Sequence, residues 1–400
     1  MAKKNDDFFK IKKEWSKVKD DILACYFKPY VSKILHTYKP LVYVDCFAGK
    51  GRFDDGSLGS PLIALKIIEE CIGSTTMRNP NVETFFIDLN YAADLKKNLA
   101  PFPNAKIISG TYEDNIYAIL NEKCGRNIFL YIDPYGIKAL QCSAFDQFAR
   151  GQFNSIELLI NLNSFGFIRE ACNALGTTFT DKEIFEDLVE YAPTQMSTSK
   201  KSVEELDKIA GGDYWQSIIE EYKAGIINGY SAEEQFAEKY RMRLMQSYRY
   251  VLNMPLRIKR GQRPKYRLIH ATNHRDGCLL MVDNICLRWE ALQEIQSGGQ
   301  MLLWNEDYNN HVVDVEDLER KATGHFSKYQ KFISLSDALA DFFMWFGPIC
   351  STGDMCQILK NLESGKQLEV QRSPDVRKDG RPTSFMTEGK GKTVFVRWRA

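Results

Sequence analysis

Residues 41–51 read LVYVDCFAGKG, an apolar run that ends in an acidic residue and a glycine-rich turn. The run Leu41–Val44 has the length and composition of a short buried strand. Glycines directly after a strand allow the backbone to approach a ligand without a Cβ in the way. In an open parallel sheet, ligands bind beyond the carboxyl ends of the strands. We therefore predict a parallel-sheet protein with a ligand site at this turn. The candidate residues are Asp45, Phe47, Ala48, Gly49 and Gly51.

Strand and helix patterns alternate after this turn. Four further apolar runs are typical of strands, at 82–87, 105–109, 128–132 and 156–162. Strands that alternate with helices form a parallel sheet covered on both faces, so the fold class is α/β. Two more strands are expected near 248–258 and 266–270. A helical insertion at about 175–247 precedes them.

The flanking segments have different patterns. Apolar residues at three- and four-residue spacing over 12–38 predict helices, and Pro29 favours a break into two. The last 65 or so residues begin with two helical patterns and end in a basic, glycine-rich pair of strands. We therefore divide the chain into N-terminal helices at 1–40, an α/β domain at 41–335 and a small domain at 336–400.

The composition excludes several classes of protein. Hydrophobic residues make up 44% and charged residues 26%, and 53 basic against 52 acidic residues give a net charge of +1, so the chain is globular and its bulk charge indicates no partner. No run is long enough to span a membrane, and the N-terminus lacks the apolar core of a signal peptide. The 10 cysteines contain no CxxC pair, so we expect reduced, mostly buried thiols and a cytoplasmic protein. His270, His274 and Cys278 fall at four-residue steps, but a strand pattern and Gly277 interrupt them, so no metal site is expected.

Acidic residues end the first two predicted strands. Asp45 beside a glycine turn suits a cationic group, and Asp88 is placed to accept hydrogen bonds from ribose hydroxyls. A phosphate ligand would favour amides without a carboxylate, and the chain lacks GxxxxGK[ST]. These features favour S-adenosylmethionine over a dinucleotide or a nucleoside triphosphate. Further cofactor candidates are Leu89, Gly110 and Tyr112, although Tyr112 fits plain core packing equally well.

The fourth strand ends in DPYG at residues 133–136. An exocyclic amine of a base is a weak nucleophile, because its lone pair is delocalised into the ring. A carboxylate and a carbonyl that accept hydrogen bonds from its two N–H groups stabilise the charge that develops during methyl transfer. Asp133, the Pro134 carbonyl and the Tyr135 ring, which can stack a base, supply these groups. The alternative is an ordinary Asp-Pro turn at a strand end.

Five motifs in this order resemble the three-Cys-motif partner (TcmP) family of bacterial methyltransferases. They are DCFAGKG at 45–51, GSPL at 59–62, IDPYG at 132–136, LIN at 159–161 and ATNHRDG at 271–277. The resemblance implies a Rossmann-like class I methyltransferase fold with a seven-stranded sheet, S-adenosylmethionine as cofactor and a C-terminal winged-helix domain. It also implies a partner protein with a three-cysteine, iron–sulfur-type motif. The DPYG form departs from the Asp/Asn-Pro-Pro-aromatic motif of adenine-N6 methyltransferases and is similar to that of tRNA guanine-N2 methyltransferases, so the base stays open.

Two basic segments predict contact with nucleic acid. The first contains Arg257, Lys259, Arg260, Arg263, Lys265 and Arg267 without an acidic residue. The second is the C-terminal domain, with Lys366, Arg372, Arg377, Lys378, Arg381, Lys390, Lys392, Arg397 and Arg399. There, Lys378 to Arg381 fits a wing turn with a basic tip, and a solvated hairpin is the alternative.

We therefore expect a methyltransferase that acts on an exocyclic base amine, adenine N6 or guanine N2, in DNA or RNA. The alternative is a non-catalytic protein of the same fold that binds nucleic acid for the three-cysteine partner.

Overall fold

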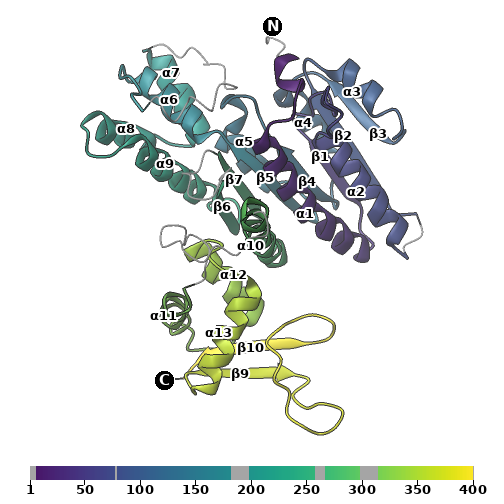
Figure 1. Cartoon of the computed structure of the whole chain (residues 1–400), viewed down its shortest axis with the longest axis vertical. Coiled ribbons are helices and arrows are strands. Elements are labelled where there is room, and N and C mark those ends of the chain that lie inside the picture. The colour runs from purple at the N-terminus through teal and green to yellow at the C-terminus, as the bar shows by residue number, and fades with distance from the viewer. Residues whose placement is uncertain (1–5, 77–78, 182–197, 257–265, 298–313, 400) are drawn as a thin grey trace. The chain divides into compact units, whose positions relative to one another are not determined.

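The computed structural model describes residues 6–76, 79–181, 198–256, 266–297 and 314–399 of the chain (Figure 1). The chain forms two compact units. Unit 1 comprises Met1–Ile258 and Gln262–Asn273, and unit 2 comprises Lys259–Gly261 and His274–Ala400.

Unit 1 is built around a seven-stranded sheet with the order β3-β2-β1-β4-β5-β7-β6. Pairs from β3 to β5 are parallel, and β7 is antiparallel to both its neighbours. Every residue of the central strands β1 and β4 is buried, as expected for strands covered on both faces. The seven strands expected from the sequence are thus confirmed. They are β1 (Leu41–Asp45), β2 (Val82–Asp88), β3 (Ala105–Ser109), β4 (Asn127–Ile132), β5 (Ser155–Leu162), β6 (Tyr250–Leu256) and β7 (Tyr266–Thr272).

Helices cover this sheet. Figure 1 shows α1 and α2 side by side, and these two helices pack against each other. Helices α7, α8 and α9 follow α6 before β6, at the place expected for the helical insertion, and α9 packs on β6 and β7. The helices are η1 (Asp6–Phe9), α1 (Glu14–His36), α2 (Ser60–Ser74), α3 (Ala92–Asn98), α4 (Tyr112–Asn121), η2 (Lys138–Leu140), α5 (Cys142–Ala149), α6 (Ser164–Ala174), α7 (Lys200–Ala210), α8 (Tyr214–Lys223) and α9 (Gly229–Leu244).

The break expected at Pro29 is wrong, because α1 runs through it as one helix. A proline inside a helix costs about 3 kcal/mol. Around it, Tyr26, Phe27 and Val31 are each 0% exposed. Burying three such side chains contributes more than the proline costs, at roughly 1.5–3 kcal/mol each. The N-terminal helices are therefore part of unit 1 and not a separate domain.

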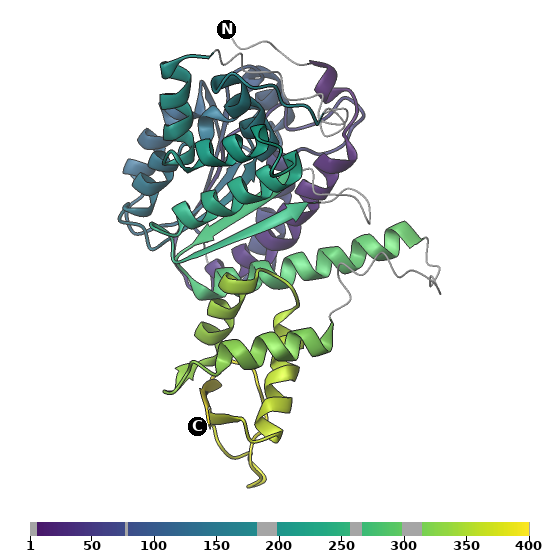
Figure 2. The same ribbon diagram turned by 90° about the vertical axis from the view of Figure 1, so that its left-hand side faces the viewer.

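Unit 2 contains four helices and a small antiparallel sheet with the order β8-β10-β9 within its described residues. Helix α10 packs against α12 and α13, and α11 packs against α13 (Figure 2). These contacts place the start of the second unit at His274, whereas the sequence predicted residue 336. The elements are α10 (Arg275–Ser297), α11 (Val315–Phe326), β8 (Ile333–Ser334), α12 (Leu335–Phe346), α13 (Thr352–Ser364), β9 (Leu368–Ser373) and β10 (Thr393–Trp398).

Two expectations from composition can be compared with the structure. Among the helices it describes, none combines the length and apolar character needed to cross a membrane. All cysteines are free, and all except Cys25 and Cys124 are buried, as expected for reduced thiols in a core.

Candidate functional site

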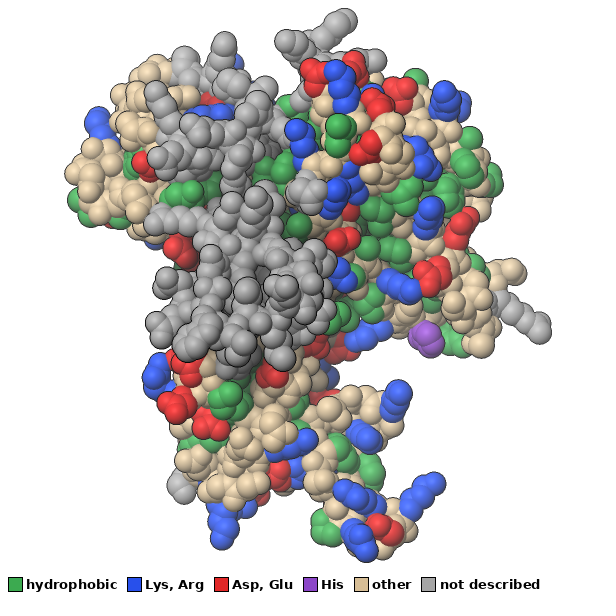
Figure 3. Space-filling view, in the orientation of Figure 1, with side chains coloured by type: hydrophobic (Ala, Val, Ile, Leu, Met, Phe, Trp, Pro, Cys, Tyr) green, Lys and Arg blue, Asp and Glu red, His purple; other side chains and the backbone are tan. Residues whose placement is uncertain are grey.

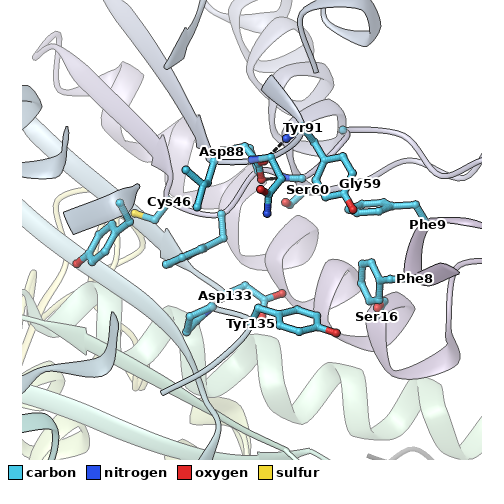
Figure 4. A pocket seen from close by; sticks show the side chains of 18 of the residues that line it. Phe8, Phe9, Ser16, Cys46, Gly59, Ser60, Asp88, Tyr91, Asp133 and Tyr135 are labelled. Carbon is cyan, nitrogen blue, oxygen red and sulfur yellow. Dashed lines mark hydrogen bonds between the residues drawn. The ribbon is translucent and has the colours of Figure 1, made fainter. Parts of the chain in front are cut away.

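A cavity of about 350 Å³ lies in unit 1 at the carboxyl ends of β1, β2, β3 and β4 (Figure 4). The structure brings nearly all predicted cofactor and catalytic residues to its wall. They are Phe47, Ala48, Gly49, Gly51, Asp88, Leu89, Gly110, Tyr112, Asp133, Pro134 and Tyr135. Of the predicted residues within unit 1 that the structure describes, only Asp45 is missing from this wall.

The glycine turn after β1 requires its glycines. Gly49 and Gly51 have φ angles of +60° and +75°, a region that side chains other than glycine rarely adopt. A Cβ at Gly49 would also lie 2.9 Å from Cζ of Phe9. The ring of Phe9, from the N-terminal 3-10 helix, therefore packs directly on the turn.

Asp88 is fixed in place by backbone amides. Its Oδ2 accepts a 2.8 Å hydrogen bond from the Gly49 amide, and its Oδ1 accepts bonds of 2.8 and 2.6 Å from the amides of Asn90 and Tyr91. A carboxylate has about four acceptor positions, so one remains on Oδ2. Asp88 thus links the turn after β1 to the turn after β2. It can still accept a hydrogen bond from a ligand hydroxyl in the cavity.

Asp45 lies beneath the cavity and is fully buried. Its Oδ2 accepts a 2.6 Å hydrogen bond from the hydroxyl of Ser60, which does line the cavity. Burial raises the pKa of the Asp45 carboxyl to about 7, although the bond from Ser60 opposes this change. The sequence predicted Asp45 as a cofactor-binding residue. In the structure its side chain does not line the cavity, whereas Ser60 of the GSPL motif does.

The β3 and β4 sides complete the wall. Gly110 has a φ of +153°, and a Cβ there would lie 2.6 Å from Nδ2 of Asn115. Tyr112 is 3% exposed, and its ring centroid lies 5.4 Å from that of Phe47. Tyr112 therefore packs in the core and also lines the cavity, so both readings of this residue apply.

The carboxylate of Asp133 has two partners that the sequence did not indicate. Lys19 of α1 donates to Oδ1 at 2.8 Å and to Oδ2 at 2.6 Å, and Asn161 of β5 donates from Nδ2 to Oδ1 at 2.6 Å. Tyr135, next in the motif, is 46% exposed, which is high for a large aromatic side chain. Figure 4 shows its ring on the same side of the cavity as Asp133.

The N-terminal segment, for which the sequence predicted only helices, forms a wall of the cavity. The helical periodicity of α1 was recognised, but periodicity does not reveal which of its polar residues turn inward. The unpredicted lining residues from this segment are Phe8, Phe9, Trp15, Ser16, Lys19 and Asp20.

The first basic segment is only partly described. Arg257, Lys259, Arg260 and Arg263 lie outside the described residues. Arg267 lies in β7 and is 6% exposed, and its Nε donates a 2.6 Å bond to Oε1 of Glu233. The reading of Arg267 as part of a nucleic-acid surface is therefore wrong, because its charge is paired inside unit 1.

The second basic segment also divides into paired and exposed residues. Arg372 donates to both carboxylate oxygens of Glu363, and Arg397 donates to Glu369 at 2.8 Å. Lys378 and Arg381 are exposed on the loop between β9 and β10. Figure 3 shows Lys and Arg side chains gathered on the loops that extend from this sheet. The other exposed basic residues around it are Lys366, Arg377, Lys390, Lys392 and Arg399.

Of the three residues noted at four-residue steps, His270 and Cys278 are buried and His274 is exposed. His270 is fully buried in β7, and its Nε2 lies 3.2 Å from Oε2 of Glu157. Within the described parts of the chain, no group of three or more His, Cys, Asp or Glu side chains could hold a metal ion.

No protein-family profile and no curated protein sequence matches the chain. Among solved structures it is similar to yhhF of Escherichia coli, assigned as a methyltransferase, with 14% identity over 34% of this chain and 68% of that one and a TM-score of 0.24. A spermidine synthase from Thermotoga maritima is 10% identical over 71% of this chain and 68% of its own, with a TM-score of 0.29. The cyclopropane synthase MmaA2 of Mycobacterium tuberculosis is 11% identical over 61% and 82%, with a TM-score of 0.26. Similarities this low carry no inference about this chain.

The class of the fold follows from the sheet. A mostly parallel seven-stranded α/β sheet, with an antiparallel β7 between β5 and β6, is consistent with a Rossmann-like methyltransferase fold. The cavity lies where such sheets bind ligands, beyond the carboxyl ends of their strands.

Proposed function

We propose that this protein is an S-adenosylmethionine-dependent methyltransferase that acts on an exocyclic amine of a base in nucleic acid. The observation that carries the proposal is the meeting of two groups of residues in one cavity. The glycine turn and Asp88 lie on one side of it, and the Asp133-Pro134-Tyr135 motif lies on another.

The residues of the cavity fit the cofactor. Asp88 keeps one acceptor position for a ribose hydroxyl, and the glycine turn leaves room for the methionine part. Gly110 and Tyr112, with Leu89, line the cavity and are proposed to contact the adenine ring. The hydroxyl of Ser60, backed by Asp45, faces the place proposed for the amino-acid end. When bound, S-adenosylmethionine would supply an electrophilic methyl group to the amine nitrogen, with its carbon–sulfur bond breaking and the amine proton passing to water.

The acceptor side is the DPY motif. Asp133 and the Pro134 carbonyl accept hydrogen bonds from the two N–H groups of the amine. These bonds direct the nitrogen lone pair toward the methyl carbon. Tyr135, which lines the cavity and is 46% exposed, stacks the base. A base within a duplex must be flipped out to reach the cavity, at a cost of a few kcal/mol.

Unit 2 is proposed to bind the nucleic-acid backbone as a winged helix. Its element order, α11-β8-α12-α13-β9-β10 with a three-stranded antiparallel sheet, supports this proposal. The loop between β9 and β10 is the proposed wing, and its exposed lysines and arginines suit phosphate contacts. The motif resemblance adds a second proposed partner, a protein with a three-cysteine motif.

The proposal is tested with tritium-labelled S-adenosylmethionine and unmodified nucleic acid, either amplified DNA or transcribed RNA. Digestion and mass spectrometry then distinguish N6-methyladenine from N2-methylguanine. We expect transfer by the wild type and none by Asp133→Asn, with S-adenosylhomocysteine raising the melting temperature of both. The exposed Asp94 provides the matched control, Asp94→Asn, which should remain active. Binding of S-adenosylhomocysteine without transfer to either nucleic acid would favour the non-catalytic alternative.

A further inference from the structure

Lys19 is fixed at the acceptor side of the cavity. It comes from α1, is 4% exposed and lines the cavity beside Asp133. Besides its two bonds to the carboxylate, its Nζ lies 4.7 Å from the ring centroid of Trp15. A lysine with this burial and these partners is a constant part of the site, because its ammonium cannot be left unpaired at such burial without a large cost.

A second carboxylate in the cavity also has its own ammonium. Asp20 is 9% exposed and lines the cavity, and one of its oxygens lies 2.5 Å from Nζ of Lys12. Burial raises the pKa of Asp20 to about 6, against the lowering effect of Lys12. The acceptor side therefore holds two carboxylates and two ammonium groups in two close pairs.

The hydrogen-bond inventory of Asp133 shows what can still bind there. Among the residues that the structure describes, Oδ1 accepts from Lys19 and Asn161, and Oδ2 accepts from Lys19 alone. One acceptor position is left, on Oδ2, for one N–H of an incoming group. That position has hydrogen-bonding capacity but little net negative charge, since Lys19 compensates the carboxylate.

We propose that Lys19 makes the acceptor side electrically neutral and so selects an uncharged amino group, such as that of a nucleobase, over an ammonium group such as that of a lysine side chain or a polyamine. This inference rests on the proposed function and narrows its substrate class. An alkylammonium needs an uncompensated carboxylate, and at Asp133 it would instead meet the like charge of Lys19. A nucleobase amine is uncharged at neutral pH and needs only acceptors.

Two cofactor analogues measure this charge directly. In S-adenosylhomocysteine no group occupies the methyl position, whereas in sinefungin a carbon that bears an ammonium replaces the methylsulfonium. The ratio of their dissociation constants reports the electrostatic character of the acceptor side. The ratio is insensitive to a change that weakens the binding of both ligands equally.

Both ligands are titrated calorimetrically into the full chain at pH 7.5, for the wild type, Lys19→Met and Lys28→Met. Lys28 is the matched control, because it lies on the same helix and pairs with Glu70 away from the cavity.

We expect the wild type and Lys28→Met to bind the two ligands within about threefold of each other. Lys19→Met should bind sinefungin at least about fivefold more tightly relative to S-adenosylhomocysteine, because Asp133 is then uncompensated. Lys19→Gln, which keeps a hydrogen-bond donor without the charge, should shift the ratio in the same direction and serves if Lys19→Met does not fold.

Three results would overturn the inference. A wild-type preference for sinefungin of about tenfold or more would show a cation-attracting site. An unchanged ratio in both Lys19 variants would show that Lys19 does not act on the acceptor position. If neither ligand binds the wild type, the proposed cofactor is wrong and the inference falls with it, a result distinct from the other two.

Discussion

Ser60 donates a 2.6 Å hydrogen bond from its hydroxyl to Oδ2 of Asp45, a carboxyl that is 0% exposed at the end of the central strand β1. The amide of Phe47 donates a second bond, to Oδ1 of Asp45 at 3.3 Å. Both Ser60 and Phe47 line the cavity, so these two bonds connect the buried carboxyl to the cavity wall.

Asp45 predicts a pH dependence of stability. Burial raises the pKa of its carboxyl to about 7, above the value of about 3.9 in an unfolded chain. The folded protein therefore binds more protons than the unfolded chain between about pH 4 and pH 7, and stability falls as pH rises through that window. Asp45→Asn removes this slope. Relative to Asp45→Asn, the wild-type melting temperature should fall by about 4 °C from pH 5 to pH 7.5 and then level off.

Thermal unfolding at a series of pH values measures this effect. The control is Asp94→Asn, since Asp94 is exposed and should give no pH-dependent difference from the wild type. Parallel curves for the wild type and Asp45→Asn would show that Asp45 stays ionised throughout.

Gly49 and Gly56 form a matched pair for the glycine turn. Both have left-handed backbone angles, with φ of +60° and +87°. A Cβ at Gly49 would lie 2.9 Å from the Phe9 ring, whereas one at Gly56 would meet nothing within 4 Å. Gly56→Ala should cost about 1 kcal/mol, for the backbone alone. Gly49→Ala should cost a further 1–3 kcal/mol, roughly the penalty for overpacking, and should weaken binding of S-adenosylhomocysteine.

Denaturant unfolding of both variants gives the two free energies. Adding Phe9→Leu to Gly49→Ala should recover part of the difference, because it removes the ring that the new Cβ meets. Equal costs for the two alanine variants would contradict the packing of Phe9 on the turn.

The parts of the site that could be predicted from the sequence are those set by local patterns. Strand ends, glycine turns and the DPY motif lie on consecutive residues, and their alignment at one edge follows from the rules of parallel sheets. The contact of Lys19 with Asp133 joins residues 114 positions apart, and no local pattern indicates it. Asp45 shows a further limit, because a strand-end carboxylate can lie under the cavity as well as in its wall.

The sequence could not show which basic side chains are paired with acidic residues and which are exposed. All basic residues of the C-terminal segment counted equally in the sequence, yet Arg372 and Arg397 are paired with Glu363 and Glu369. Lys378 and Arg381 remain exposed, although Nε of Arg381 lies 3.9 Å from Oδ2 of Asp379. Burial and pairing of each charge can be read only from the three-dimensional structure.

Replacing Tyr135 should weaken the binding of nucleic acid without lowering the stability of the fold. Its ring is 46% exposed at the cavity, so replacing it should change the melting temperature by little. Tyr135→Ala should raise the KM for nucleic acid by about tenfold, because stacking on an aromatic ring contributes roughly 1–3 kcal/mol per base. Tyr135→Phe keeps the ring and should stay within about twofold of the wild type. A KM that is unchanged in Tyr135→Ala would remove Tyr135 from the proposed base-binding residues.

The loop between β9 and β10 predicts a salt-dependent affinity for nucleic acid. Neutralising Lys378 and Arg381 together should weaken binding and reduce the slope of log K against log salt by about 1–2, since each lost phosphate contact reduces it by about 0.9 on duplex DNA. Fluorescence anisotropy with a labelled duplex and a labelled RNA hairpin, from 50 to 300 mM salt, measures both quantities. The control is the double variant Arg320→Ala, Lys321→Ala on α11, which removes the same charge from unit 2 at a pair of residues bound to Asp317. If this control lowers the slope as much as the loop variant does, the effect belongs to net charge alone and the proposed role of the wing is wrong.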